Sequence, residues 1–284
     1  MSRFLEAMRD ELARLGDRGV FSVAEWHAGR VESLDIIKTN PCQNVYSVAK
    51  VFVVTAVGLL VDRGLLSTDE VVTDILADEI PEGCQPAWYK TTVDMLLLHK
   101  VGLPGGFLDI DCYDSKGFGE DYLAYTLTYP TPEDYTPEKS TYTDAAFYIL
   151  SRIVEKRAGE PLDNLLWREL LFPIGCLEAA FSRCPKGHPM GATGLYIRAA
   201  EVAKLGSIYL NGGMYGSRRI LSEAWVGTVL SRGYELKPKY AGRAYGKGGM
   251  RGQMLLVLPE QRRVLAWQGY GSTDLTETAI NYKD

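Results

Sequence analysis

The sequence predicts an α+β fold (an α/β sandwich), in which one antiparallel sheet is built from both ends of the chain and flanked by helices. Strand patterns lie near both termini, at 21–36 and from residue 245 onward, whereas helical patterns fill the middle. A strand left unpaired at either end would expose backbone groups, so the two ends are expected to pair. We expect one unit over residues 1–284, with sheet regions at 1–45 and about 190–284 and a mostly helical region inserted at about 46–189.

The N-terminal part predicts a helix followed by a β-hairpin. The residues 21–36 form two strand-like segments that meet at HAGR, where Gly29 suits a tight turn. Before them, apolar residues recur on one helical face: Phe4, Leu5, Met8, Leu12 and Leu15.

The middle of the chain predicts several helices. The apolar run that stops before Gly64 is expected to be buried, and Thr143 with Asp144 can cap a later helix. The stretch 113–137 is rich in Tyr, Thr, Pro and acid, so it is expected to be irregular. The predicted helices span 51–61, 145–157 and 161–172, and a further one starts with 92–98 and is ended by GLPGG at 102–106.

The last third predicts a return to mixed structure. A helix at 199–209 is followed by the breaker sequence NGG. Two strands, 252–258 and 263–268, are separated by a Pro-Glu turn. Little chain follows them, so a C-terminal helix is expected to be short (274–282) or absent.

Composition excludes several classes of function. The chain has 284 residues and a net charge of −5, without a basic block, so nucleic acid is not an expected partner. No apolar run is long enough to span a membrane, and the charged N-terminus does not resemble a signal peptide, so a cytoplasmic location is expected. The oligomeric state is left open.

The five cysteines do not follow a metal-binding or disulfide pattern. Their number is odd and no C-x-x-C pair occurs, so free thiols in a reducing compartment are expected and no metal site is predicted. The cysteines are Cys42, Cys84, Cys112, Cys176 and Cys184.

Ser47 and Lys50 form an S-x-x-K pair at the expected start of the buried helix. Residues i and i+3 share one helical face, so the lysine amine can reach the serine oxygen and take its proton. A helix N-terminus also offers backbone N–H groups that can hold an oxyanion. The alternative is an N-capping serine followed by a solvent-facing lysine.

Two further segments carry side chains suited to acyl chemistry. Tyr142 can relay protons if a neighbouring cation lowers the pKa of its phenol, although it can equally be a packing residue at a helix entrance. Lys247 precedes Gly248 and Gly249, where small residues allow a substrate backbone to approach closely and the lysine can bind a carboxylate. The alternative for this segment is a glycine-rich loop.

Taken in order, these segments resemble the penicillin-recognising serine hydrolases, whose marks are S-x-x-K, Y-x-N and K-T-G. Here they are YSVAK (46–50), YTD (142–144) and KGG (247–249). Further segments resemble the class C-type members of this superfamily, which includes β-lactamases, D-Ala-D-Ala peptidases and esterases. These segments are LLLHKVGLP (96–104), MGATGLYIRAAE (190–201), YLNGG (209–213) and GGMRGQ (248–253).

The resemblance implies a mechanism without a metal or organic cofactor. Ser47 would attack a small ester, amide or β-lactam and form an acyl-enzyme, while Lys50 and Tyr142 share proton transfer. Lys247 would orient the substrate carboxylate or support the Tyr142 phenolate. The oxyanion would be held by the backbone N–H groups of Ser47 and Met250, the latter placed on the strand that follows Gly248 and Gly249.

Two departures from the family pattern bear on the substrate. Asp144 stands where the family has Asn, and an ionised Asp only accepts hydrogen bonds. Gly248 stands where the family has Thr, so a hydroxyl that helps to hold a carboxylate is missing. Both favour an alternative, a non-hydrolytic or very slow binding or regulatory protein with this fold. A D-Ala-D-Ala carboxypeptidase is a further alternative.

Other polar residues are assigned structural roles. His99 is interpreted as a hydrogen-bonding scaffold residue, and Glu160 as a helix-entry acid. The acidic residues near Asp109 and Asp111 do not match an EF-hand. The aromatic residues Tyr122, Tyr125 and Tyr129 are expected to line the rim of the site.

Overall fold

The computed structural model describes residues 1–16, 19–132, 135–271 and 273–283, and these fall into two compact units. The first unit contains residues 1–51, 168–180 and 195–284, and the second contains 52–167 and 181–194. The sequence predicts a single unit over residues 1–284, and this stays a prediction.

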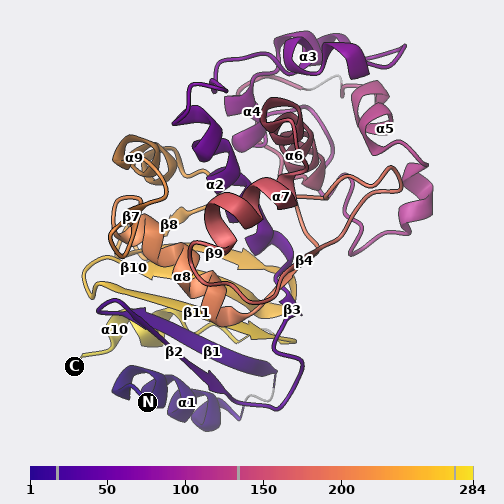
Figure 1. The fold of residues 1–284 in the computed structure, drawn as a ribbon. Coiled ribbons are helices and arrows are strands. Elements are labelled where there is room, and N and C mark those ends of the chain that lie inside the picture. Colours follow the sequence, from indigo (N-terminus) through magenta and orange to yellow (C-terminus); the bar gives the residue numbers. More distant parts are fainter. Residues whose placement is uncertain (17–18, 133–134, 272, 284) are drawn as a thin grey trace. The chain divides into compact units, whose positions relative to one another are not determined.

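The first unit is built on a six-stranded sheet with the order β2-β1-β11-β10-β9-β8 (Figure 1). The N-terminal strand β1 pairs antiparallel with the C-terminal β11, with Ala24 opposite Ala266, so the predicted pairing of the two chain ends is confirmed. The β1–β2 hairpin turns at Ala28 and Gly29, both with left-handed φ, as a two-residue hairpin requires. The strands are β1 (Val20–His27), β2 (Arg30–Asp35), β8 (Lys237–Lys239), β9 (Ala244–Gly249), β10 (Gln253–Leu258) and β11 (Arg263–Gly269).

Helices cover both faces of this sheet (Figure 1). Alternate residues of a strand face opposite sides, so one face carries Leu256 and Trp267 and the other carries Leu255 and Val264. The first face packs against the N- and C-terminal helices, and the second packs against α8. The predicted α+β sandwich is therefore confirmed. The helices of this unit are α1 (Arg3–Leu15), α8 (Ala199–Leu210), α9 (Glu223–Arg232) and α10 (Thr276–Asn281).

The N-terminal helix α1 is amphipathic as predicted, with one correction. Ser2 caps its start by accepting a hydrogen bond from the Leu5 N–H, and Gly16 ends it in the left-handed region. Four of the five predicted apolar residues are buried, but Leu15 is 49% exposed because it is the last helical residue and the core cluster ends at Leu12.

A buried ion pair joins the first and last strands. The Arg263 guanidinium donates to the Glu25 carboxylate (2.7 Å) and lies over the rings of Phe4 and Tyr282, at 5.1 and 5.3 Å. Both charged groups are almost completely buried. A charge in such a position is tolerated only because its partner is fixed.

Short elements complete the first unit. β3 pairs with β5, and β6 pairs with β7 in a small hairpin. The bounds are η1 (Tyr46–Val48), β3 (Gln43–Asn44), β4 (Ala180–Phe181, at the border of the two units), β5 (Leu195–Ile197), β6 (Met214–Tyr215), β7 (Arg218–Arg219) and η6 (Met250–Gly252).

The second unit is mostly helical in its described residues, and α6 packs against α3, α4 and α7. The predicted cap is confirmed, because the Thr143 hydroxyl accepts from the Ala145 N–H and the helix begins at Asp144. Helix α2 begins in the first unit and continues into the second. The elements are α2 (Ala49–Val61), α3 (Val72–Ile75), η2 (Ala77–Glu79), η3 (Pro86–Lys90), α4 (Val93–Leu97), η4 (Ser115–Phe118), α5 (Tyr122–Thr128), α6 (Asp144–Ala158), α7 (Leu162–Leu166) and the π-helical η5 (Trp167–Leu171).

The stretch 113–137 is more regular than predicted. It contains η4 and α5, and Asp121 caps α5 by accepting from the Ala124 N–H. Composition did not predict this helix, because its buried face is made of Tyr and Thr as well as Leu. Residues 133–134 of this stretch lie outside the described residues.

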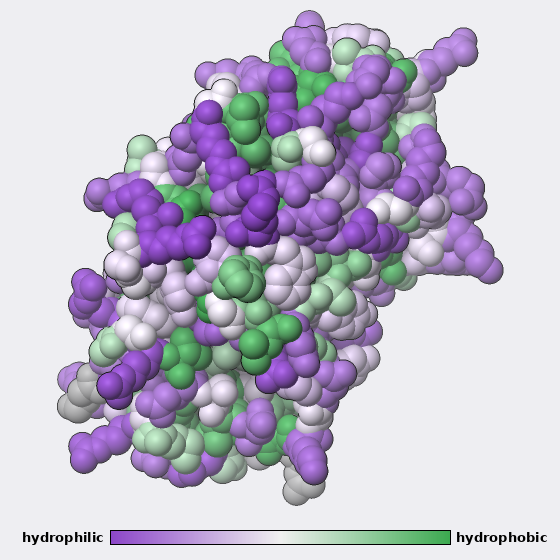
Figure 2. Space-filling model, viewed as in Figure 1, coloured by the Kyte–Doolittle hydropathy of each residue, from purple (hydrophilic) through white to green (hydrophobic). Residues whose placement is uncertain are grey.

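The surface, the helices and the cysteines can each be compared with what the composition predicts. On the face drawn in Figure 2, hydrophobic side chains of the described residues form small separate patches among hydrophilic ones. Among the described helices, none combines the length and the apolar character needed to cross a bilayer. All five cysteines are free thiols, as predicted.

Close packing of α8 on the sheet requires glycine at position 206. A Cβ there would lie 2.6 Å from a Val264 methyl and 2.7 Å from a Leu255 methyl, both in the core. Gly206→Ala is expected to lower the free energy of unfolding by about 1–3 kcal/mol, because the core has no room for the added group. Urea denaturation measures this change.

The matched control is Gly227→Ala in α9, where a Cβ meets nothing within 4 Å. The free energy of unfolding of this variant is expected to rise by about 0.5–1 kcal/mol, because alanine loses less backbone entropy than glycine when the helix forms. Equal gains for both variants would contradict the packing argument.

Candidate functional site

Ser47 lies in a turn whose backbone conformation is unusual. It sits in η1, directly after Tyr46, whose φ is +46°. A non-glycine residue in the left-handed region costs of order 1–3 kcal/mol and persists only where the surroundings hold it. Here the Tyr46 N–H donates to the Asn44 side chain (2.8 Å), and the Val48 N–H donates to the Val45 carbonyl (3.0 Å). Backbone strain that is maintained in this way is common where a side chain must be fixed in one orientation.

Lys50 lies one helical turn further on and reaches Ser47. Its Nζ lies 3.1 Å from the Ser47 Oγ, within hydrogen-bond distance, and the lysine side chain is completely buried. The alternative of a solvent-facing lysine is therefore wrong. A buried amine in contact with a hydroxyl is the arrangement needed for proton removal from that hydroxyl.

Strand β9 carries the KGG segment, which is therefore not a loop. Residues 247–249 pair with β10 on one side, Lys247 opposite Leu255 and Gly249 opposite Gln253. On the other side the short strand β8 pairs only with 244–246 of the described chain. The outer edge of 247–249 thus extends beyond the last β8 pair, where an extended substrate group can approach backbone N–H and C=O groups.

The Ser47 turn and the end of β9 are in direct contact. A Cβ on Gly249 would lie 2.5 Å from the Val45 carbonyl oxygen, closer than real carbon atoms approach. Glycine is therefore required for β9 to lie this near the turn that carries Ser47. The structure thus brings the predicted residues of the first unit together.

Met250 lies at a different kind of position from the one predicted. It is not on a strand, but begins η6, the three-residue loop of the β9–β10 hairpin. Arg251 in this loop has a left-handed φ of +59°, and its guanidinium lies over the Tyr270 ring at 4.3 Å. The loop forms because the β9–β10 pairing ends at Gly249 and Gln253, which leaves three residues to reverse the chain.

Lys247 has a partner that the sequence did not indicate. Its ammonium forms an ion pair with the carboxylate of Glu235, a residue that is completely buried and has a left-handed φ of +62°. The signal could not be found in the sequence, because Glu235 lies in the turn before β8, twelve positions away, and only the β8–β9 pairing places it near Lys247.

In the second unit, Tyr142 is 40% exposed and is held by His99. The two rings lie 4.5 Å apart, centroid to centroid, and the buried His99 Nδ1 accepts from the Thr143 N–H (3.3 Å). The His99 carbonyl in turn accepts from the Thr141 N–H (3.0 Å). The interpretation of His99 as a scaffold residue agrees with this geometry.

Asp144 is buried in the first turn of α6 and belongs to an acidic cluster. One carboxylate oxygen each of Asp109, Asp111 and Asp144 lies within 4.8 Å of the others, and Asp111 also accepts from the Thr193 hydroxyl. Oxygen ligands of this kind suit Mg²⁺ or Ca²⁺, although acidic groups are also common without an ion. Within the described residues this is the group whose spacing could hold a metal.

The aromatic residues expected at the rim pack on neighbouring rings. Tyr122 is buried, and Tyr125 and Tyr129 lie against the Phe107 ring at 5.3 and 4.6 Å. Phe118 contacts both Tyr122 and Tyr125. The expectation is wrong for Tyr122, whose ring is buried within the 107–129 segment. For Tyr125 and Tyr129, which are half-buried, the rim position stays a prediction.

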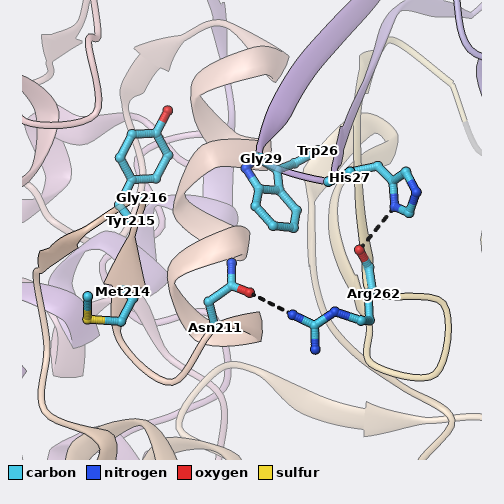
Figure 3. Close-up of a pocket in the computed structure, with 9 residues that line it drawn as sticks. Trp26, His27, Gly29, Asn211, Met214, Tyr215, Gly216 and Arg262 are labelled. Carbon is cyan, nitrogen blue, oxygen red and sulfur yellow. Dashed lines mark hydrogen bonds between the residues drawn. The ribbon is translucent and has the colours of Figure 1, made fainter.

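A separate cavity of about 640 Å³ lies in the first unit, beside the β1–β2 turn and the end of α8 (Figure 3). His27 Nδ1 is 3.3 Å from the Arg262 carbonyl, and the Arg262 guanidinium is 3.5 Å from the Asn211 side chain. Trp26 and Met214 add apolar surface. Its lining residues include no serine, lysine or cysteine, so it lacks a serine–lysine pair like the one found at the start of α2.

Comparison with known families agrees with this geometry. A family model described as Beta-lactamase matches residues 37–269, which is more than half of the chain. The chain belongs to the beta-lactamase family. This superfamily of serine hydrolases includes β-lactamases, penicillin-binding proteins and esterases, so the resemblance drawn from the motifs is confirmed.

Individual relatives are similar over different extents. Penicillin-binding protein 4 of Amycolatopsis lactamdurans is 35% identical over 133 residues, covering 45% of this chain and 33% of that protein. Among solved structures, a penicillin-binding protein homolog from Caulobacter crescentus has a TM-score of 0.75 at 18% identity, over 98% of this chain and 96% of that one. A family VIII carboxylesterase has a TM-score of 0.72 at 18% identity with the same coverage. The two structures show the fold alone.

The two neighbouring glycines of β9 allow a direct test of this contact. Gly249→Ala is expected to lower the free energy of unfolding by about 1–3 kcal/mol, because its Cβ would push against the Val45 carbonyl. A Cβ on Gly248 would make only ordinary contacts, at 3.6 Å or more, so Gly248→Ala is expected to change the free energy of unfolding by about 0.5 kcal/mol or less. Thermal and urea unfolding of both variants checks this. Indistinguishable stabilities would show that the turn and the strand are not in contact.

Proposed function

We propose that this protein is a serine hydrolase that forms an acyl-enzyme on Ser47 and acts on small esters or amides. The observation that carries the proposal is the buried Lys50 amine at 3.1 Å from the Ser47 hydroxyl. An unactivated serine is a poor nucleophile, and an adjacent base is what gives it reactivity. The membership of a family of hydrolases supports the same conclusion.

The proposed reaction follows from these groups. Lys50 takes the Ser47 proton as the serine oxygen attacks the substrate carbonyl, and the resulting oxyanion is stabilised by the backbone N–H groups of Ser47 and Met250. The proton then passes to the leaving alcohol or amine as its bond to the carbonyl carbon breaks. A water molecule attacks the acyl-enzyme, releases the acid and returns the proton to Ser47. Tyr142 is assigned as a proton relay because the YTD segment follows the S-x-x-K pair in the order typical of the superfamily.

The substrate preference proposed here is for an ester or simple amide before a β-lactam. Gly248 brings no hydroxyl to β9, and Asp144 cannot donate a hydrogen bond when ionised. A slow or non-hydrolytic binding protein is the second candidate, since the same two departures favour it. The residues Ser47 and Lys50, with their observed contact, support an active enzyme.

Covalent labelling tests the nucleophile. A fluorophosphonate is expected to add one adduct to the protein, seen by intact mass, and Ser47→Ala is expected to lose it. Lys50→Met is expected to slow labelling by about 10²–10⁴-fold, because no base remains beside the serine. Equal labelling of wild type and Ser47→Ala would exclude Ser47 as the nucleophile.

The same experiment with a penicillin and a cephalosporin separates the candidate functions. A fluorophosphonate adduct without a β-lactam adduct is the expected result for an esterase. A β-lactam adduct that turns over rapidly would indicate a β-lactamase, and one that persists would indicate a penicillin-binding protein. No adduct with any reagent would support the binding-protein alternative.

Tyr142→Phe tests the proposed proton relay. Loss of the hydroxyl is expected to lower kcat/KM for p-nitrophenyl butyrate by about 10²–10⁴-fold. The free energy of unfolding is expected to change little, because the ring and its packing on His99 are kept. Tyr113→Phe, at a tyrosine that is 59% exposed, is the matched control and is expected to retain full activity. An unchanged kcat/KM in Tyr142→Phe would remove Tyr142 from the mechanism.

A further inference from the structure

We propose that Glu235 is a positioning and specificity-determining residue, which compensates the charge of Lys247 so that β9 receives uncharged acyl substrates in preference to carboxylate-bearing ones. This inference rests on the proposed hydrolase function. It concerns groups of the first unit only: the ion pair, the KGG segment and the edge of β9.

The position of Glu235 is costly in two independent ways. Its carboxylate is completely buried, where an ionised group is disfavoured unless it is paired. Its backbone adopts a left-handed φ of +62°, which a side chain with a Cβ rarely adopts. The helix α9 ends at Gly233 in the same left-handed region, so glycine is used nearby where only chain reversal is needed. A glutamate at this position is disfavoured both by burial of its charge and by its backbone conformation, which indicates that its carboxylate is required.

The β8–β9 pairing explains how this carboxylate reaches Lys247. Lys237, two residues after Glu235, is opposite Gly246, the residue before Lys247. The chain that leads into β8 therefore brings Glu235 beside Lys247, and the two form an ion pair in which the lysine is also mostly buried. The lysine is thereby fixed in orientation and its positive charge is matched by a negative one.

A matched charge changes what the end of β9 can bind. A free lysine ammonium attracts a substrate carboxylate, but a carboxylate arriving here also meets the like charge of Glu235. Gly248, the next residue, offers no hydroxyl to help hold an anion. What the strand offers instead is its backbone edge at 247–249, beyond the last pair with β8, which suits the amide or ester groups of a neutral substrate.

The test compares two esters with the same leaving group. One is p-nitrophenyl pentanoate, which is uncharged, and the other is the mono-p-nitrophenyl ester of glutaric acid, which carries a carboxylate on an acyl chain of similar length. Wild type is expected to favour the neutral ester in kcat/KM by tenfold or more. Glu235→Gln keeps the shape of the side chain but removes its charge, and it is expected to raise the ratio of acidic to neutral kcat/KM at least tenfold.

Two further variants make the result specific to this pair. Glu25→Gln removes an equally buried carboxylate from its partner Arg263 in the same sheet, and it is expected to leave the ratio unchanged. Adding Lys247→Met to Glu235→Gln is expected to return the ratio to the wild-type value, since the uncompensated cation is then gone. Unfolding curves of each variant establish that it is folded.

The outcomes separate the two proposals. A wild type that favours the acidic ester, or a folded Glu235→Gln with an unchanged ratio, would overturn the role of Glu235 while leaving Ser47 chemistry intact. If Glu235→Gln does not fold, the wild-type ratio decides alone. No Ser47-dependent turnover of either ester would instead overturn the proposed function, together with the inference that rests on it.

Discussion

The first unit depends on the antiparallel pairing of β1 with β11. This contact joins residues more than two hundred positions apart and makes β11 an interior strand, so that helices can cover both faces of the sheet. The buried pair of Glu25 and Arg263 crosses the same two strands and contacts the terminal helices through Phe4 and Tyr282. Strands β10 and β9 follow from β11 by hairpins, and their register decides where the KGG segment lies.

Ser47 lies in a strained turn that is supported from two directions. Tyr46 is held in a left-handed conformation by Asn44, and the carbonyl of Val45 lies against Gly249 of the sheet. A strained residue stays in place only when its neighbours leave it no alternative, and a packed sheet edge provides such neighbours. The stability of the sheet and the position of Ser47 are thus linked through one glycine.

The charge of Lys247 is balanced within the first unit. The motif lysine lies on β9, and the Glu235 carboxylate makes the pair neutral. A neutral pair attracts a substrate carboxylate less than a lone lysine does. The motifs and the family model thus identify the superfamily, whereas the partner of Lys247 carries the proposal about the substrate.

Periodicity and motif order determined the fold class, the helices α1, α2, α4, α6 and α8, and the candidates Ser47 and Lys50, because these are local signals along the chain. The sequence missed α5, whose buried face is partly Tyr and Thr, and it did not indicate that Tyr122 is buried or that Tyr125 and Tyr129 pack on Phe107. Only the tertiary structure decided that Lys50 is buried, that Gly249 lies against the Ser47 turn, and that Glu235 meets Lys247. The contacts of Gly249 and Glu235 depend on the register of β8, β9 and β10 and on the chain that leads into them, and neither spacing nor composition records that register.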